Sequence, residues 1–235
     1  MAQTPRERAR LRTMEDITRI GREHLALHGA AGLSLRAVAR DLGVVSSAVY
    51  RYVGSRDELL TLLVVDGYNA LGDAVDAALA EVPEQDYGAK FRALGRAVRV
   101  WGLAEPARYG LLFGSPVPGY NAPAEQTTAP GTRVVGRLVE IIDGAFGAAV
   151  LEPVQAGSRS TGSLMEDLSA IKAQLGLAVP EALLARGVLV WAALFGAVNF
   201  EVFGQYGAAT FGDPAALFEC HLDALAGLVG LPGSG

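Results

Sequence analysis

The sequence of 235 residues predicts an all-α protein. No stretch alternates convincingly between apolar and polar residues, whereas apolar residues recur at spacings of three and four, which is the period of an amphipathic helix. Hydrophobic residues make up 51% of the chain and charged residues 19%, a composition that supports a sizeable core. Because the length exceeds one average domain, we expect one small and one larger domain.

The amino-terminal part of the chain predicts short helices separated by glycine. A first helix is expected over residues 12–27 and ends at Gly29 to Gly32, because glycine suits a helix carboxy terminus. Ser34 is the expected N-cap of a second helix over residues 35–42. A third helix is expected over residues 46–53.

A long fourth helix is expected over residues 56–80. Ser55 and Glu58 have the spacing of a capping box at its start, and Pro83 follows its end. The same apolar spacing predicts further helices over residues 87–104, 107–113, 132–149, 163–175, 180–203 and 214–229, with Pro- and Gly-rich loops over 114–131 and 153–162.

Compartment and solubility follow from three simpler features. The single cysteine, Cys220, cannot form an internal disulfide, which favours a reducing cytoplasm. Residues 1–12 are rich in arginine but lack the apolar core of a secretory signal. The longest uncharged stretch with the pattern of a helix, residues 187–200, is shorter than the roughly 20 apolar residues that span a bilayer, so we expect a buried core helix and no membrane partner.

The net charge of −5 is unevenly distributed. Residues 1–60 hold ten arginines and seven acidic residues, whereas the remainder holds ten basic and eighteen acidic residues. A basic end on an acidic body is typical of a protein in which one end meets nucleic acid. A merely solvated amphipathic surface is the alternative that charge alone leaves open.

Residues 34–58 have the pattern of a helix-turn-helix. Two short helices flank the turn at Gly43, and glycine permits a backbone reversal that a Cβ would resist. Ala39, Val44 and Val49 are small or branched apolar residues, placed where the two helices must pack at a steep angle. The second helix of such a pair enters the major groove of DNA.

This segment resembles the DNA-binding domain of the TetR family. The resemblance covers about residues 12–65 and rests on Leu33 to Ala39, Leu42 to Val44, Ala48 to Val53 and Gly54 to Leu60. It implies a DNA-binding domain over residues 1–58, of which 1–11 form a flexible basic arm, and a helical ligand-sensing and dimerisation domain over 59–235. Residues 46–53 would then be the recognition helix.

The resemblance also implies which side chains meet DNA. Small side chains lead the recognition helix and would face base edges with weak discrimination, so that DNA shape contributes to specificity; they are Ser46, Ser47 and Ala48. The expected phosphate contacts are Arg36, Tyr50, Arg51, Tyr52 and Arg56. Tyr50 has an alternative as a core residue packed on the first helix.

Two features leave the details of this interface open. The family usually has Ser or Thr at the position of Val45, and valine cannot cap a helix, so Ser46 is an alternative cap. The arginines of the arm either reach an adjacent groove or phosphates, or belong to a solvated tail; they are Arg6, Arg8, Arg10 and Arg12.

The larger domain resembles the WHG-type carboxy-terminal domain of one TetR subgroup over about residues 85–225. The matching segments are Val100 to Gly102, Pro106, Tyr109, Leu111 to Pro116 and Pro118 to Tyr120. The resemblance implies that the last two helices build a dimeric four-helix bundle. Ala192, Ala193, Gly196 and Ala197 offer small residues for such an approach, which predicts a homodimer on a palindromic operator. A monomer core is the alternative.

Aromatic residues of the larger domain are candidates for the wall of an apolar effector pocket, although each is also a candidate core residue. The candidates are Trp101, Tyr109, Phe113, Phe146, Trp191 and Phe195, with Arg99, Asn199 and Glu201 as possible polar determinants.

No catalytic constellation stands out in the sequence, and we expect neither enzyme activity, cofactor nor metal. His24 and His28 have helical i,i+4 spacing without an accompanying glutamate or cysteine, and nucleophile-elbow, phosphate-loop and dinucleotide motifs are absent. The sequence therefore predicts a ligand-responsive transcriptional regulator, acting as a repressor. A DNA-associated structural or partner-binding protein without ligand sensing is the alternative, and a helical enzyme is a more remote one.

Overall fold

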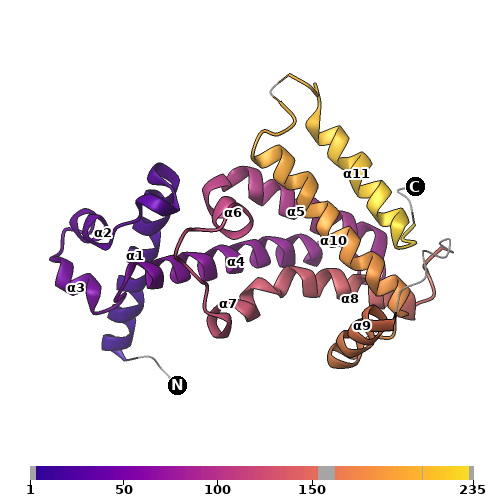
Figure 1. The fold of residues 1–235 in the computed structure, drawn as a ribbon, viewed down its shortest axis with the longest axis horizontal. Coiled ribbons are helices and arrows are strands. Elements are labelled where there is room, and N and C mark those ends of the chain that lie inside the picture. Colours follow the sequence, from indigo (N-terminus) through magenta and orange to yellow (C-terminus); the bar gives the residue numbers. More distant parts are fainter. Residues whose placement is uncertain (1–3, 153–161, 208, 233–235) are drawn as a thin grey trace. The chain divides into compact units, whose positions relative to one another are not determined.

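The computed structural model describes residues 4–152, 162–207 and 209–232, and this part of the chain is helical, with no strand (Figure 1). The predicted all-α class is confirmed. The helices are α1 (Pro5–His28), α2 (Leu35–Asp41), α3 (Ser46–Tyr50), α4 (Arg56–Ala80), α5 (Tyr87–Ala104), α6 (Pro106–Phe113), α7 (Ala124–Gly131), α8 (Arg133–Gly147), α9 (Gly162–Leu175), α10 (Glu181–Val202) and α11 (Pro214–Leu228), with one 3-10 turn, η1 (Ala30–Gly32). The loop expected over residues 153–162 lies almost wholly outside the described residues.

Helix α1 begins at Pro5, seven residues before the expected start. Thr4 and Glu7 form a capping box, in which the Thr4 side chain accepts from the Glu7 N–H at 3.2 Å and the Glu7 carboxylate accepts from the Thr4 N–H at 2.7 Å. Pro5 occupies the first turn, where its missing N–H costs nothing. The expectation of a flexible arm is therefore wrong for residues 5–11, which are helical.

A second difference is α7, which lies inside the expected loop over residues 114–131. The Pro123 carbonyl accepts hydrogen bonds from the Gln126 and Thr127 N–H groups and from the Thr127 hydroxyl, and these bonds start the helix. Pro130 stands in its last turn. Its presence made the segment resemble a loop, although a proline near the end removes only one hydrogen bond of the helix.

The chain packs as two compact units, and the division does not follow the expected boundary at residues 58 and 59. The amino-terminal unit holds residues 1–70 and 104–131, and the carboxy-terminal unit holds residues 71–103 and 132–235. The division falls within α4, which runs unbroken from Arg56 to Ala80. Helices α6 and α7 therefore belong with the helix-turn-helix.

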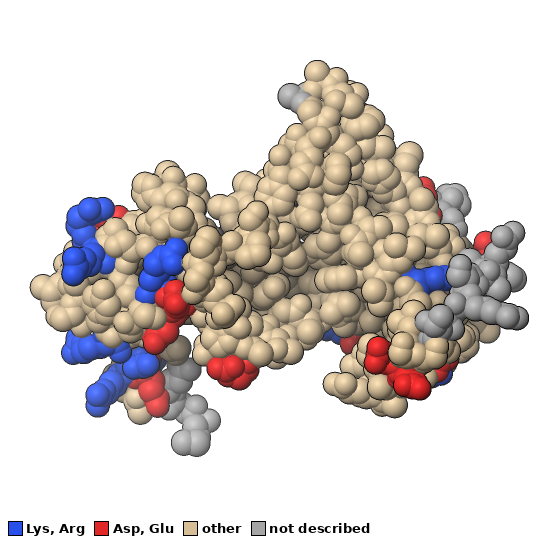
Figure 2. Space-filling view, in the orientation of Figure 1, with Lys and Arg blue, Asp and Glu red and all other residues tan. Residues whose placement is uncertain are grey.

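Basic side chains gather over the amino-terminal helices, at the left of Figure 2. Most of the remaining surface in that view, including the part over α10 and α11, carries neither basic nor acidic groups. On this face, the basic end of the sequence is therefore also a basic region of the surface.

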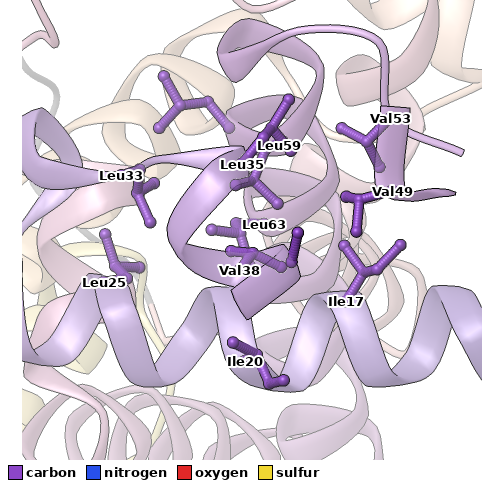
Figure 3. Packing of buried hydrophobic residues seen from close by; sticks show 12 residues of the cluster. Ile17, Ile20, Leu25, Leu33, Leu35, Val38, Val49, Val53, Leu59 and Leu63 are labelled. Carbon is purple, nitrogen blue, oxygen red and sulfur yellow. The ribbon is translucent and has the colours of Figure 1, made fainter. Parts of the chain in front are cut away.

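The core of the amino-terminal unit joins α1 to α2, α3 and α4. Figure 3 shows Ile17 and Ile20 on α1 pointing toward Val38, and both isoleucines are at most 3% exposed. Burying each such side chain contributes roughly 1.5–3 kcal/mol. The α3 and α4 side chains of the same cluster are Val49, Leu59, Leu60 and Leu63. Partly buried residues from the second segment also pack on this cluster; they are Ala107, Leu111, Val117 and Tyr120.

In the carboxy-terminal unit, three arginines of α5 form hydrogen bonds and ion pairs with residues of α10, α11 and the segment that follows α11. The buried Arg92 binds Asp223 and the Pro232 carbonyl, and the other two pairs are Arg96 with Glu219 and Arg99 with Glu201. Gly95 lets α5 and α11 approach closely, because a Cβ at that position would lie 2.4 Å from the Leu222 side chain.

Helix α10 is 22 residues long and, by length and composition alone, meets the requirement for crossing a membrane. It is longer than the uncharged stretch over residues 187–200 because the helix continues through Arg186 and Glu201. A buried share of 39% in its most apolar window and contacts with α8, α9 and α11 give it a role in packing within this unit.

Candidate DNA-binding surface and ligand cavity

The turn between α2 and α3 has the geometry that the sequence predicts. Gly43 has φ of +69°, in the left-handed region that glycine adopts without cost. The Gly43 and Val44 N–H groups donate to the carbonyls of Arg40 and Ala39, each at 3.0 Å. With Val49 1% exposed, α3 is anchored by one buried side chain and leaves its other faces free.

Neither short helix has a side-chain cap. Val45 is the N-cap residue of α3 and Ser46 is the first helical residue, so the alternative in which Ser46 caps the helix is not observed. Ser34 is the N-cap residue of α2, but its hydroxyl makes no capping hydrogen bond, contrary to expectation. An absent cap typically costs about 1 kcal/mol, so α3 depends on Val49 and the turn for its stability.

The expected contact residues of α2 and α3 form an accessible surface. Arg36, Ser47, Tyr50 and Arg51 are exposed, and Ser46 and Ala48 are half-buried. Tyr50 is 45% exposed, so its alternative as a core residue is not observed. Neither Arg36 nor Arg51 has an ion-pair partner among the described residues. Both guanidinium groups are therefore available to a phosphate.

Tyr52 and Arg56 have partners within the chain. The Arg56 Nη2 donates to the Ala30 carbonyl at 2.8 Å, which ties the start of α4 to the turn after α1. Tyr52 is half-buried, and the Arg10 guanidinium lies 5.5 Å from its ring centroid. The sequence offers no signal for the Arg56 contact, because Ala30 contributes only a backbone carbonyl.

The capping box predicted at the start of α4 forms in altered form. The Glu58 N–H donates to the Ser55 hydroxyl at 3.1 Å, as expected. The Glu58 carboxylate accepts from the Gly54 N–H at 2.7 Å, one residue before the N–H that a capping box uses. The two bonds still fix the path from α3 into α4.

His24 and Asp41 connect α1 to the end of α2. His24 is 5% exposed, and its Nε2 lies 2.6 Å from the Asp41 carboxylate. The hydrogen bond from His24, followed by that from Arg40, holds the pKa of Asp41 below its ordinary value. The His24 and His28 rings meet edge to face at 5.8 Å. Among the described residues, no group of three or more His, Cys, Asp or Glu side chains is placed to hold a metal ion.

The six aromatic candidates for an effector pocket do not lie in one unit. Tyr109 and Phe113 belong to the amino-terminal unit, where their rings lie 5.0 Å apart. Tyr109 is fully buried, and burial raises the pKa of its hydroxyl. In the carboxy-terminal unit Trp101 and Phe195 are buried, and Phe146 is 37% exposed beside an open hollow.

The sixth candidate, Trp191, lines a cavity between α8 and α10. The cavity measures about 80 Å³ and is walled almost entirely by aliphatic side chains. Its lining is Val135, Leu138, Val139 and Ile142 from α8, Val179, and Leu183, Leu184, Gly187, Val188 and Trp191 from α10. The sequence alone does not indicate this cavity, because aliphatic residues at helical spacing are the ordinary pattern of a core helix.

On its α4 side, α8 carries two arginines. The Arg133 guanidinium lies 2.8 Å from the carboxylates of both Asp73 and Asp76, and Arg137 lies 2.7 Å from Asp76. Arg137, with Arg133, holds the pKa of Asp76 below its ordinary value. Gly72 makes room for this arrangement, because a Cβ there would lie 2.7 Å from the centre of the Arg133 guanidinium. Helix α8 thus links the cavity wall to α4.

A helix-turn-helix whose second helix is anchored by Val49 and whose exposed side chains include Arg36 and Arg51 defines a helix-turn-helix DNA-binding regulator. Comparison with known proteins gives the family. Residues 17–63 match the family described as "Bacterial regulatory proteins, tetR family", and residues 91–225 match "Tetracyclin repressor-like, C-terminal domain". The chain belongs to the TetR family of transcriptional regulators.

Relatives that match more than nine tenths of the chain agree with this assignment. The HTH-type transcriptional regulators Rv1816 of Mycobacterium tuberculosis and Mb1846 of Mycobacterium bovis are each 44% identical over 92% of this chain and 92% of their own. The crystal structure of the regulatory protein SCO4313 is 35% identical with a TM-score of 0.76, covering 95% of this chain and all of that one. The TetR family regulator PfmR from Thermus thermophilus shares the fold, with a TM-score of 0.56 at 17% identity over 92% of this chain and 98% of its own.

Proposed function

We propose that the protein is a cytoplasmic, ligand-responsive repressor that binds a palindromic operator as a homodimer and is released by a small molecule. The observation that carries the proposal is the exposed face of α2 and α3, on which Arg36 and Arg51 lie without ion-pair partners in the described chain. Free guanidinium groups beside an anchored helix suit phosphates on both sides of a major groove.

The α3 side chains that we propose to contact base edges are small. Ser46, Ser47 and Ala48 lead the helix, and the first two offer hydroxyls that accept or donate to any base. Tyr50 and Arg51 follow them and would hold the backbone. Tyr52 remains a candidate for the same backbone, although it already lies beside Arg10. Arg56 is instead given a structural role, because its guanidinium donates to the Ala30 carbonyl.

A second copy of the chain is the proposed partner of α10 and α11. An open, mainly apolar groove runs between these helices, with a volume of about 320 Å³. Its floor includes Gly196, at which a Cβ would meet no atom within 4 Å, and Phe200 at its edge is 47% exposed. Small residues beside exposed apolar ones suit close, self-complementary packing of two helices about a two-fold axis.

The test of DNA binding is footprinting of the DNA upstream of the gene with the purified protein. We expect protection of a palindrome whose half-sites lie about 34–36 Å apart, or a multiple of that distance. Arg51→Met should weaken protection uniformly across sequences, because it removes a phosphate contact. Absence of any protected palindrome at moderate salt would refute the proposal.

The test of dimerisation is sedimentation of two matched variants. Gly196→Arg places a charge in the groove and should yield a monomer that binds DNA weakly. Gly136→Arg is the control, because Gly136 on α8 also has nothing within 4 Å of a built Cβ and lies outside the groove. A dimer that persists in Gly196→Arg would show that another surface joins the two copies.

A further inference from the structure

We infer that the cavity between α8 and α10 binds a linear alkyl chain, with the polar end of the ligand left outside. The inference rests on the proposed function, since it names the chemical class of the effector. Figure 1 shows α8 and α10 crossing in the carboxy-terminal unit, and the cavity lies where their apolar faces meet.

The lining of the cavity excludes a polar ligand group. Every side chain in it is aliphatic except Trp191, and Gly187 adds only backbone. A hydroxyl or amide placed there would lose its hydrogen bonds to water without replacement. The buried part of the ligand must therefore be hydrocarbon.

The size of the cavity selects a chain over a ring. Its volume of about 80 Å³ is well below the roughly 150 Å³ of an apolar cavity that holds benzene. One side is open, and Val188 at its edge is 57% exposed. A slender chain enters end first and extends through the opening, whereas a ring would need the two helices to separate.

Occupancy of this cavity would act on α4 through α8. Val135 and Val139 face the cavity, while Arg133 and Arg137 on the same helix bind the α4 carboxylates. A ligand that shifts α8 therefore displaces Arg133 and Arg137, which form ion pairs with Asp76. Helix α4 starts directly after the helix-turn-helix. Regulation by this route requires that the ligand bind one arrangement of α8 more tightly than another.

Tryptophan fluorescence provides a direct binding assay in the full-length chain. The sequence has two tryptophans, so Trp101→Phe leaves Trp191 as the reporter in the cavity wall. Titration with 1-octanol should change its emission saturably. The matched probe 1,8-octanediol should bind roughly tenfold more weakly or worse, because its leading end is a second hydroxyl that finds no partner in the cavity.

Filling the cavity from Gly187 tests the location. A Cβ at Gly187 would lie 3.4 Å from the Ile142 side chain, which is ordinary contact, so Gly187→Ala should fold and bind octanol more weakly. Gly187→Leu should abolish binding, and Gly136→Ala, outside the cavity, should leave it unchanged. If Gly187→Leu does not fold, the alanine variant still decides the result.

Saturable octanol binding that falls from glycine to alanine supports the inference. Absence of binding, equal affinity for the diol, or equal binding in the Gly187 and Gly136 variants would overturn it. DNA binding is measured separately in the same preparations. Failure to bind any operator would refute the proposed function while leaving the octanol result intact.

Discussion

Replacing Arg56 with methionine removes a guanidinium that donates to the Ala30 carbonyl at 2.8 Å and keeps most of the aliphatic stem. This bond joins the first turn of α4 to the turn that follows α1. The matched change is Arg51→Met, one residue after α3, where the guanidinium is exposed and has no ion-pair partner among the described residues. We expect the two variants to differ in what they lose.

The expected loss of stability in Arg56→Met is about 1 kcal/mol. A hydrogen bond from a charged donor contributes about 1.5–3 kcal/mol, but the Arg56 side chain is 35% exposed and solvent weakens the interaction. Removing a positive charge from the amino-terminal turn of a helix also returns a few tenths of a kcal/mol. For a chain of this length, about 1 kcal/mol lowers the Tm by roughly 2–4 °C. Arg51→Met should leave the Tm unchanged.

The dependence of operator affinity on salt distinguishes a structural from a phosphate-binding arginine. Each phosphate contact contributes about 0.9 to the slope of log affinity against log salt, so Arg51→Met should reduce the slope by about 1.8 in a dimer with two half-sites. Arg56→Met should leave the slope unchanged. Thermal melting and fluorescence anisotropy over a range of salt concentrations give both quantities on the same samples.

A slope that falls by the same amount in Arg56→Met, with no change in Tm, would refute the structural role. It would mean that the guanidinium leaves Ala30 for a phosphate when DNA binds. An unchanged slope in Arg51→Met would refute its assignment to the phosphate backbone.

Three further predictions concern the turn, the α4–α8 contact and acid stability. Gly43→Ala should cost about 1 kcal/mol in urea unfolding because of its φ of +69°, and Gly43→Asn should cost less. Gly72→Ala should displace the Arg133 guanidinium and cost about 1 kcal/mol or less; in a double-mutant cycle with Arg133→Met the two losses should not add. The hydrogen bond from His24 lowers the pKa of Asp41 in the folded state, so the ionised Asp41 carboxylate stabilises the fold. This stabilisation is present above the unfolded-state pKa and is lost as the pH falls through the folded-state pKa. Asp41→Asn should therefore remove this part of the acid dependence of the Tm below about pH 4, and an unaltered profile would contradict the prediction.

Much of the fold was predictable because helices depend on local signals. The period of apolar residues and the stops at glycine place most helices within a few residues, and α4 and α5 agree with their expected ranges throughout. The early start of α1 was also predictable, since Thr4, Pro5 and Glu7 form a complete capping signal.

For the candidate sites, too, features that depend on local sequence were predictable, whereas features that depend on tertiary packing were not. The turn at Gly43 and the exposure of Tyr50 and Arg51 follow from a local motif. The partners of Arg56, like those of Arg92 on α5, are fixed by tertiary packing between residues far apart in sequence. A cavity forms where two helices pack incompletely against each other, and no residue type in the sequence indicates where this occurs.

The discontinuity of the amino-terminal unit limits how such a regulator can be taken apart. Leu111, Val117 and Tyr120 cover the same core as α1 to α4, and the Tyr120 and Thr61 hydroxyls lie 3.0 Å apart. A chimera that joins residues 1–70 to a foreign sensor would uncover this part of the core. The transferable module is a pair of segments, and a donor sensor would have to accept residues 104–131 as an insertion between its own helices.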